Sequence, residues 1–344
     1  MQGRKPHRGF TLIELLVVIA IIALLISILL PSLSSARLAA RSLKTASNAR
    51  SVMLGVATYL TTSRSYPPHY VYGADETSTT WDYNDQQVTN PNLSHGYVHW
   101  SYSLFADGSI PEEAFTNPLV PTRGGAPATN PGIRPEDWED DQQNDQGGTK
   151  SAPNALPTDR QVKRIGFGGN GAIFPRNKFY ASGGERKNNF VNDSMIAFTS
   201  STIILGEYMY SKRIQWGALQ TGAGATGGGL YKTHRPFTPF VGVSAGDDVY
   251  SEPMSGGGRA RFRYPNENEL LAEEQCAGAI DGSTDTTLNA VGRQAPGSKD
   301  KFGGMSNFAY IDGHVEAMTV LNSIKKRQWG DRFYSLTGDN QVEP

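Results

Sequence analysis

One acidic side chain stands inside a long apolar run near the start of the chain. Glu14 follows Ile13 in the stretch GFTLIELLVV, and positions 15–30 are apolar except for Ser27. An ionisable group in a membrane span costs up to about 3 kcal/mol on insertion scales at the bilayer centre, and less near its edge. A segment that only anchors the protein in a membrane does not require this acid, so we expect Glu14 to have a separate function.

Two other sets of polar residues could hold a metal ion. Asp281, Ser283 and Asp285 place oxygen atoms at alternate positions, as calcium loops often do. No later acid stands at loop-closing spacing, so an ordinary turn is the favoured interpretation and calcium the weaker alternative. His95 and His99 could share a metal only on a helix, because on a strand they lie about 13 Å apart.

No complete catalytic motif occurs in the chain. Asp312, His314 and Glu316 are residue types that occur together in catalytic sites. A turn at Asp312 and a solvent-facing strand carrying His314 and Glu316 account for their positions without catalysis. The sequence lacks Gly-x-Ser-x-Gly, His-Glu-x-x-His and paired cysteines. We therefore predict that the chain is not an enzyme and needs no cofactor. The lone Cys276 excludes an internal disulfide.

The composition indicates a strand-rich body without a general nucleic-acid footprint. The 344 residues carry a net charge of -1, so no nucleic-acid partner is expected. The 38 glycines and 20 prolines make up about 17% of the chain, against about 12% in an average protein. This excess is typical of turn-rich, β-rich domains.

The N-terminal segment predicts a single membrane crossing. Residues 1–9 contain Arg4, Lys5 and Arg8 and no acid, which by the positive-inside rule keeps this leader in the cytoplasm. Residues 10–30 would form a helix about 31 Å long, close to the hydrocarbon thickness of about 30 Å. The rest of the chain would be exported. Signal-peptidase cleavage after Ala36, a plain anchor, and a segment that uses Glu14 remain as alternatives.

Residues 8–14, RGFTLIE, together with the apolar run resemble the signal of type IV pilins and of type II secretion pseudopilins. In that family a prepilin peptidase cuts after the glycine matched by Gly9. The new N-terminal residue, matched by Phe10, is N-methylated, and the glutamate matched by Glu14 becomes the fifth residue. The resemblance implies three partners: prepilin peptidase, other pilin-like subunits in a homo- or hetero-polymer, and an inner-membrane assembly platform. It also implies a bacterial inner-membrane location, with the body in the periplasm or at the cell surface.

The resemblance gives Glu14 a physical role. Cleavage after Gly9 would create an ammonium at Phe10, and pilin-like subunits pack their N-terminal helices side by side. Opposite charges about 4 Å apart attract by about 4 kcal/mol at an effective dielectric near 20. That attraction is comparable to the cost of burying the acid, so Glu14 would favour assembly with a neighbour's N-terminus.

One long helix is predicted to carry these residues. Pro31 should kink the helix or melt it locally, and an amphipathic half follows at residues 32–62. The apolar positions of that half recur every three or four residues: Leu38, Ala46, Ala49, Val52, Met53, Val56 and Leu60. We therefore divide the chain into a leader at 1–9, a helix at 10–62 and an exported body at 63–344.

The C-terminal stretch NFAYIDGHVEAM predicts a β-hairpin turning at Asp312 and Gly313. A two-residue turn would place Phe308, Tyr310, Val315 and Ala317 on one buried face. The stretch resembles the C-terminal motif of a pilin-like group abundant in planctomycete-type bacteria, whose glycine pair and Asp-Gly pair are matched by Gly303, Gly304, Asp312 and Gly313. The histidine of that motif is replaced by Phe302.

Other segments complete the expected fold. Alternation at Val98, Trp100, Tyr102 and Leu104 predicts a strand, as does the run at 202–208. Residues 116–135 and 137–157 are poor in apolar side chains and are interpreted as surface loops. The expected class is α+β, with a long N-terminal helix packed on a loop-rich antiparallel sheet.

Two classes of function remain. The first is a structural pilin-like or pseudopilin-like subunit that acts by polymerisation. The alternative is a membrane-anchored binding or hydrolytic domain, for example for polysaccharide, that uses the leader only for placement. Trp81, Tyr97, Trp100 and Tyr102 could stack on sugar rings in that second class, provided that they are exposed. The sequence leaves open whether the polymer is a pseudopilus, a pilus or a tip complex.

Overall fold

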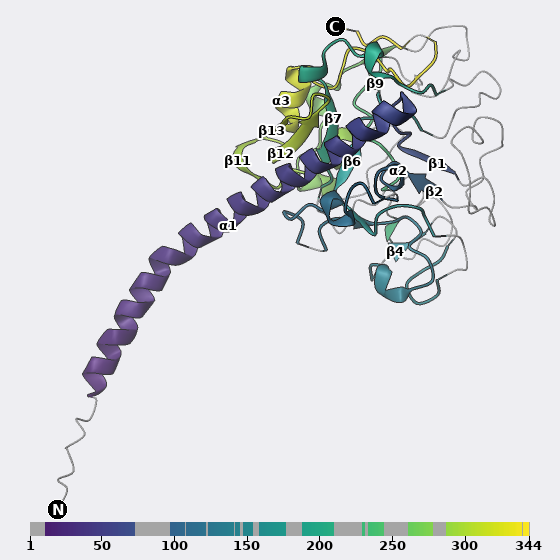
Figure 1. Cartoon of the computed structure of the whole chain (residues 1–344). Helices are drawn as coiled ribbons and strands as arrows, with labels where there is room; N and C mark the ends of the chain where they lie inside the picture. Colours follow the sequence, from purple (N-terminus) through teal and green to yellow (C-terminus); the bar gives the residue numbers. More distant parts are fainter. Residues whose placement is uncertain are drawn as a thin grey trace, which may run out of the picture.

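The computed structural model describes residues 11–72, 97–106, 108–121, 123–140, 142–144, 147–153, 158–176, 188–209, 229–230, 233–243, 261–277, 287–338 and 340–343. The chain forms a long N-terminal helix followed by a β-rich body, which confirms the α+β class. In Figure 1 the helix α1 (Leu12–Ser63) projects from the body as a curved stalk, and its last turns lie within the body.

Helix α1 is a single element of 52 residues, or about 78 Å at 1.5 Å per residue. It ends at Arg64, which adopts the left-handed conformation with φ 57° and closes the last turn through its backbone N–H to Leu60. Pro31 lies inside the helix, and no local melting occurs there. The projecting half of the ribbon bends smoothly (Figure 1), since one missing backbone donor can be absorbed by curvature along so long a helix.

The main sheet has five antiparallel strands, with β12 (Gly303–Tyr310) at its centre. One edge of β12 pairs with β13 (Val315–Thr319). The other edge is shared by β11 (Ala295–Asp300) and β7 (Ile203–Glu207), and β7 in turn pairs with β6 (Phe167–Gly169). The strand predicted at 202–208 is therefore confirmed.

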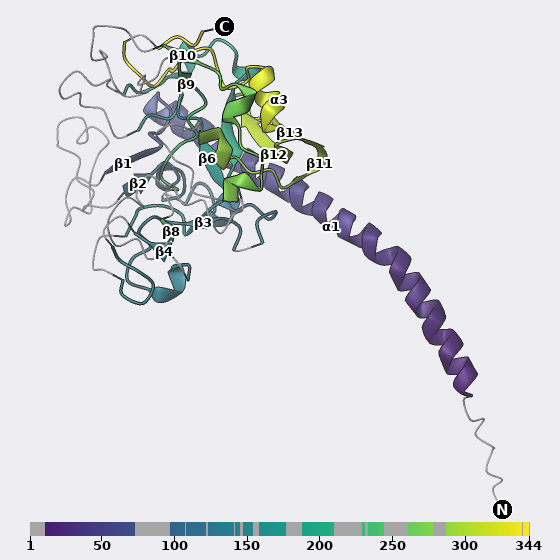
Figure 2. The ribbon, with the colours of Figure 1, turned by 180° about the vertical axis from the view of Figure 1, so that it is seen from behind.

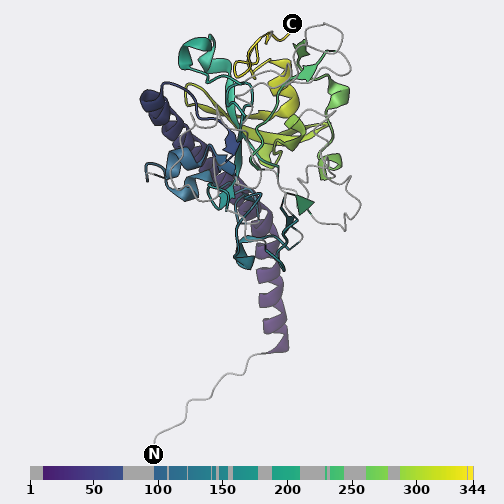
Figure 3. The ribbon, with the colours of Figure 1, turned by 90° about the vertical axis from the view of Figure 1, so that its right-hand side faces the viewer.

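Helix α1 packs on one face of this sheet and contacts β11, β12 and β13. The helix lies in front of the strands in Figure 1 and behind them in Figure 2. Seen from the side in Figure 3, it crosses the body and continues beyond it as the stalk. The large aromatic residues Trp100, Phe308, Tyr310 and Trp329 are fully buried in the same core as Val52 of the helix.

Short elements surround the sheet. Two-stranded ladders join β1 (Tyr70–Tyr72) to β2 (Tyr97–His99), β3 (Ala126–Pro127) to β5 (Arg164–Ile165), β4 (Gln142–Gln143) to β8 (Gly229–Leu230), and β9 (Val241–Gly242) to β10 (Phe262–Arg263). The helices α2 (Tyr102–Phe105) and α3 (Val320–Lys325) are short. The 3-10 turns are η3 (Glu112–Phe115), η4 (Pro135–Asp137), η5 (Asp193–Met195), η6 (Thr199–Ser201), η8 (Glu267–Glu269), η9 (Gln275–Ala277) and η10 (Thr287–Ala290).

The C-terminal hairpin forms, but in a register one residue away from the predicted one. Phe308 pairs with Glu316 and Ala309 with Val315, and the Tyr310 N–H donates to the His314 carbonyl at 2.9 Å. The loop therefore has three residues and ends at Gly313, whose φ of +88° suits a left-handed bulge position. A one-residue shift exchanges the faces of β13, so Val315 and Ala317 do not share a face with Phe308 and Tyr310, as we had predicted.

Two further predictions were wrong. The strand that begins at Tyr97 stops at His99, and Tyr102 to Phe105 turn into helix α2. Trp100 and Leu104 are both buried, a four-residue spacing that fits a helical turn as well as a strand. The described parts of 116–135 and 137–157 also bury side chains, among them Leu119 and Trp138, so these stretches belong to the body and are not only surface loops.

Candidate functional site

The projecting half of α1 exposes an unusually large apolar surface. Its apolar side chains are 40% to 79% exposed: Leu12, Ile13, Leu15, Leu16, Val17, Val18, Ile19, Ile21, Ile22, Leu24, Leu25, Ile26, Ile28, Leu29, Leu30, Leu33 and Leu38. Within the described residues, one helix, α1, is long and apolar enough to cross a membrane. A contiguous apolar surface of this extent marks a contact with lipid or with other protein.

Glu14 caps the start of the same helix. Its carboxylate Oε2 accepts hydrogen bonds from the backbone N–H and the hydroxyl of Thr11, both at 2.8 Å. The Thr11 hydroxyl accepts the Glu14 N–H at 3.2 Å in return, which completes a capping box. The Glu14 side chain therefore has a partner within its own helix. Gly9 and Phe10, the predicted processing residues, lie outside the described residues.

The other half of α1 is anchored in the body through a mixed face. Ala49, Val52, Met53 and Val56 are buried there as predicted, whereas Leu38 is 40% exposed. Two polar residues, Thr45 and Asn48, are buried on the same face. The Thr45 hydroxyl donates to Asn117 Oδ1 at 2.8 Å, and the Asn48 amide donates to the Thr116 carbonyl at 2.8 Å.

A buried carboxyl group lies behind this face. Glu207 on β7 is fully buried and accepts hydrogen bonds from the backbone N–H of Asn307, at 3.1 Å, and from its side-chain amide. The same amide contacts Ser42 of α1 at 3.3 Å. Burial raises the pKa of Glu207 to about 7, and the hydrogen bonds from Asn307 offset this only in part. A titratable group is thus linked to α1 through one side chain.

The glycine pair Gly303 and Gly304 allows a close backbone contact. A Cβ atom on Gly304 would lie 2.4 Å from the Arg293 carbonyl oxygen. Phe302, at the position of the motif histidine, is buried in the core, and its carbonyl accepts a hydrogen bond from the buried Arg293 guanidinium. The side chain of Phe302 thus packs in the core beside the strand that the glycine pair begins.

We expect Gly304→Ala to lower the free energy of unfolding by about 3 kcal/mol, the upper end of the usual cost of overpacking, because the new methyl group would overlap backbone atoms that cannot turn aside. Gly313→Ala is the matched control. Its φ is positive, but nothing lies within 4 Å of the added carbon, so only conformational strain of about 1 kcal/mol is expected. Denaturant unfolding of both variants in detergent measures the difference, and an equal loss at the two sites would contradict the close contact.

The residues Asp312, His314 and Glu316 form a surface cluster around the hairpin loop. Asp312 Oδ1 lies 2.6 Å from His314 Nδ1 and accepts the His314 backbone N–H at 3.1 Å. The His314 ring stacks on Tyr310 at 4.1 Å, and the Tyr310 hydroxyl lies 3.4 Å from Glu316. These contacts close and brace the loop, which is the structural role expected from the sequence.

The predicted metal candidates are not brought together in the part of the chain that can be described. Asp281, Ser283, Asp285 and His95 lie outside it, and within it no three His, Cys, Asp or Glu residues group as metal ligands. His99 is fully buried with its ring centre 5.1 Å from that of His69. Burial lowers the pKa of His69 to about 3 and that of His99 well below its usual value, so both rings are neutral core residues.

The aromatic side chains considered for sugar stacking are mostly inside the body. Tyr97 and Trp100 are buried, Tyr102 is half-buried, and Trp81 lies outside the described residues. The exposed aromatic row that would have favoured a polysaccharide-binding surface is therefore not formed by Tyr97, Trp100 and Tyr102.

Comparison with known proteins identifies one feature of the chain. Residues 4–30 match the model of the prokaryotic N-terminal methylation motif. No curated protein and no solved structure matches the chain. The motif, on a long apolar helix, fits a type IV pilin-like protein with a pilin or pseudopilin type of leader. It implies processing by a prepilin peptidase and pilin-like assembly in general, and is consistent with membrane anchoring. The resemblance around residues 302–313 stays a prediction.

Proposed function

We propose that the protein is a structural subunit of a pilin-like or pseudopilin-like polymer. Prepilin peptidase would cut after Gly9, and Phe10 would become the N-methylated first residue. The observation that carries this proposal is the exposed apolar half of α1, which starts with the methylation motif and with Glu14. The body would be exported from the inner membrane, and a membrane platform would add subunits to the polymer.

Apolar side chains of α1 remain exposed after residue 30, where the segment long enough to cross a bilayer ends. This exposure supports a polymer subunit over a protein that is only anchored. Leu33, Leu38 and Leu43 follow the apolar run at five-residue intervals and are 47%, 40% and 74% exposed. Five residues turn a helix by about 140°, so the three side chains point to different sides. Helices of several neighbouring subunits would cover all three, whereas a bilayer that covers residues 12–30 leaves them in water.

The capping box of Glu14 supports a two-stage role for this acid. Before processing, the carboxylate is held by Thr11 at the start of its own helix. Cleavage after Gly9 would place an ammonium beside Thr11. In a bundle of helices the carboxylate of one subunit would then exchange its cap for the ammonium of a neighbour, and ion pairing is stronger in a medium of low dielectric than in water.

Expression in a host with a pilin assembly platform tests the proposal. The chain should appear as a sheared, sedimenting polymer, visible by labelled electron microscopy, when prepilin peptidase is present. It should stay in the membrane fraction when the peptidase is inactivated. A chain that remains in the membrane fraction with the active peptidase would refute polymerisation and leave an anchored body as the function.

A further inference from the structure

The N-terminal part of the chain and the body carry opposite net charges. Residues 1–64 contain eight of the 32 basic side chains and one of the 33 acidic side chains. The other 24 basic and 32 acidic side chains belong to residues 65–344, which therefore have a net charge of -8. Charges of opposite sign favour a contact between the helix of one copy of the chain and the body of another.

Three cations of α1 form a stripe along one side of the helix. Arg37, Arg41 and Lys44 follow one another at steps of four and three residues, which places their side chains one above the other. All three are exposed, and in the part of the chain that the structure describes their side chains make no ion pair or hydrogen bond. We call them the basic stripe. It ends one residue before Thr45, the first described residue of α1 that is buried in the body.

The position of the basic stripe along α1 argues against lipid headgroups as its partner. Headgroups extend about 5–8 Å beyond the hydrocarbon on each side of a bilayer. At 1.5 Å per residue, Arg41 and Lys44 lie about 16 Å and 21 Å beyond residue 30. A bilayer that covers residues 12–30 therefore leaves both cations outside its headgroups, and an acidic protein surface fits them better.

The turn η3 presents a carboxylate next to α1. The Asn48 amide donates to the Thr116 carbonyl at 2.8 Å and lies 3.4 Å from the Glu113 carbonyl, so η3 packs on the helix at the level of Asn48. The Glu113 side chain is exposed and forms no ion pair among the described residues. Lys44 of the same chain is four residues, or about 6 Å, below this level.

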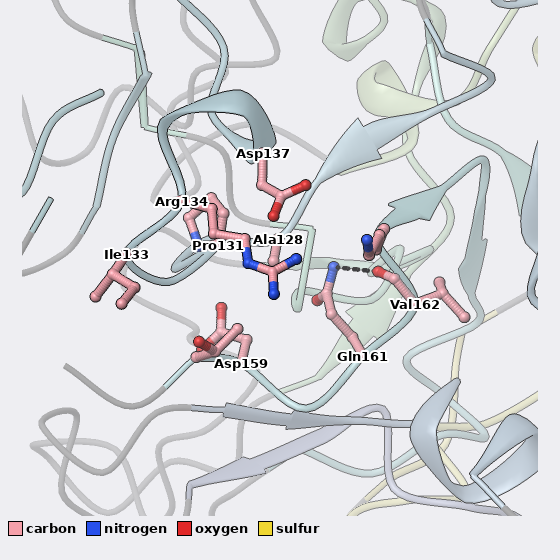
Figure 4. Close-up of a pocket in the computed structure, with 10 residues that line it drawn as sticks. Ala128, Pro131, Ile133, Arg134, Asp137, Asp159, Gln161 and Val162 are labelled. Atoms are coloured by element: carbon pink, nitrogen blue, oxygen red, sulfur yellow. Dashed lines mark hydrogen bonds between the residues drawn. The ribbon is translucent and has the colours of Figure 1, made fainter. Parts of the chain in front are cut away.

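The other charges near η3 are balanced within the body. The Glu112 carboxylate accepts the backbone N–H of Lys163. Lys163 and Arg134 line a cavity of about 330 Å³ together with Asp137 and Asp159. Figure 4 shows Arg134 extending between these two aspartates. Two cations thus stand against two carboxylates, so the cavity adds no net charge beside η3.

Assembly through Glu14 would bring the basic stripe and η3 of two copies to the same level, a step that rests on the proposed function. Where the ammonium of Phe10 in one subunit meets Glu14 of its neighbour, the first subunit is shifted by four residues, about 6 Å, toward the body end of the neighbour. The same shift sets Lys44 of the first subunit level with Asn48 of the neighbour, and therefore with the neighbour's η3.

We propose that the basic stripe docks on η3 of a second copy of the chain, with Lys44 of one subunit beside Glu113 of the next. Arg41 and Arg37 reinforce the attraction from about one and two turns further away from the body. The contact sets the position of each body relative to its neighbour, and it adds to the pairing of the helices at their N-terminal ends.

Charge reversal in the full-length chain tests this contact. Lys44→Glu and Glu113→Lys should each lower the ratio of sheared polymer to membrane-bound chain by about tenfold, because losing an exposed ion pair and adding an equal repulsion contribute about threefold each. The chain that carries both changes should regain most of the polymer, since opposite charges then meet again between copies. Undiminished polymer from either single variant, or no recovery in the double variant, would overturn the docking.

Arg50→Glu is the matched control for charge. Arg50 is exposed on α1, but the six residues that separate it from Lys44 turn the helix by about 240°, so it points away from the basic stripe. Its polymer should equal that of wild type, and the same loss as in Lys44→Glu would contradict a contact specific to the stripe. Unfolding temperatures equal to wild type, measured in detergent, show that the variants fold.

The same experiment separates this docking from the proposed function. A wild-type chain that forms no polymer would refute both. Wild-type polymer that is insensitive to all three charge reversals would refute the docking alone. Release of Lys44→Glu from the membrane with its polymer unchanged would identify anionic lipid as the partner of the basic stripe and would likewise overturn the docking.

Discussion

Glu14→Ala is expected to abolish polymer assembly while leaving the chain in the membrane and cleaved after Gly9. The substitution leaves the neighbour's ammonium buried without its partner, and breaking a buried ion pair in this way costs about 3–5 kcal/mol, equivalent to about a thousandfold in the equilibrium for adding a subunit. Cleavage should persist, because Glu14 is not at the cleaved bond. The measurement is the amount of chain in the sheared polymer fraction, with the membrane fraction as the reference.

Two further variants separate the charge of Glu14 from its capping role. Glu14→Gln keeps an oxygen that can accept the Thr11 N–H but has no charge, so it should fail to assemble like the alanine variant. Thr11→Ala removes the hydroxyl partner but keeps the carboxylate, so it should still assemble. Normal polymer from Glu14→Gln would show that pairing with an ammonium is not the function of this residue.

Glu207→Gln is expected to change the pH dependence of stability. The folded pKa of Glu207 is about 7 against 4.5 for an exposed glutamate, so the folded state binds the proton more tightly. Its contribution to stability is complete below pH 4.5 and is lost as the pH rises through 7. The loss amounts to about 3 kcal/mol. The glutamine variant has no such loss, so the free-energy difference between variant and wild type should grow by about this amount from pH 4.5 to pH 7.

The measurement should follow the difference in free energy of unfolding between Glu207→Gln and wild type. The stability of either protein alone also changes with pH through the buried His69 and His99, whose effect has the opposite sign. Their lowered pKa values reduce stability as the pH falls below about 6.5, but they do so equally in both proteins. Glu267→Gln is the control. Hydrogen bonds from Lys301 and Lys325 lower the pKa of this exposed group to about 2, so its folded-state carboxylate stays ionised from pH 4.5 to pH 7 and its effect on stability is lost mainly below this window. A pH-independent difference for Glu207→Gln would contradict a protonated carboxyl group.

The N-terminal helix could be predicted from the sequence because its signals are strong and local. The apolar run and the spacing of Val52 and Val56 belong to one periodic segment, whereas the capping box of Thr11 and Glu14 was recognised only in the structure. The buried Thr45 and Asn48 were missed because they are polar, although they continue the same helical face. Pro31 was expected to melt or kink the helix, but the loss of one hydrogen bond did not interrupt it.

Other errors came from contacts distant in sequence. Asp312 and Gly313 signal a turn, but the loop length that sets the register depends on whether Gly313 is a turn residue or a bulge. The short pattern from Val98 to Leu104 fits either element, and in the structure Trp100 packs against Phe115 and Phe174 between the end of β2 and the start of α2. Glu207 and Asn307 come together only when β7 pairs with β12, so no local pattern could have revealed them.

The mass of the mature N-terminus, measured on protein recovered from its native cell, tests the central claim most directly. The account predicts a first peptide that starts at Phe10 and carries one methyl group on its amine. A chain that still starts at Met1 would contradict processing by prepilin peptidase, and one that starts at Arg37 would show release by signal peptidase and leave no stalk to assemble.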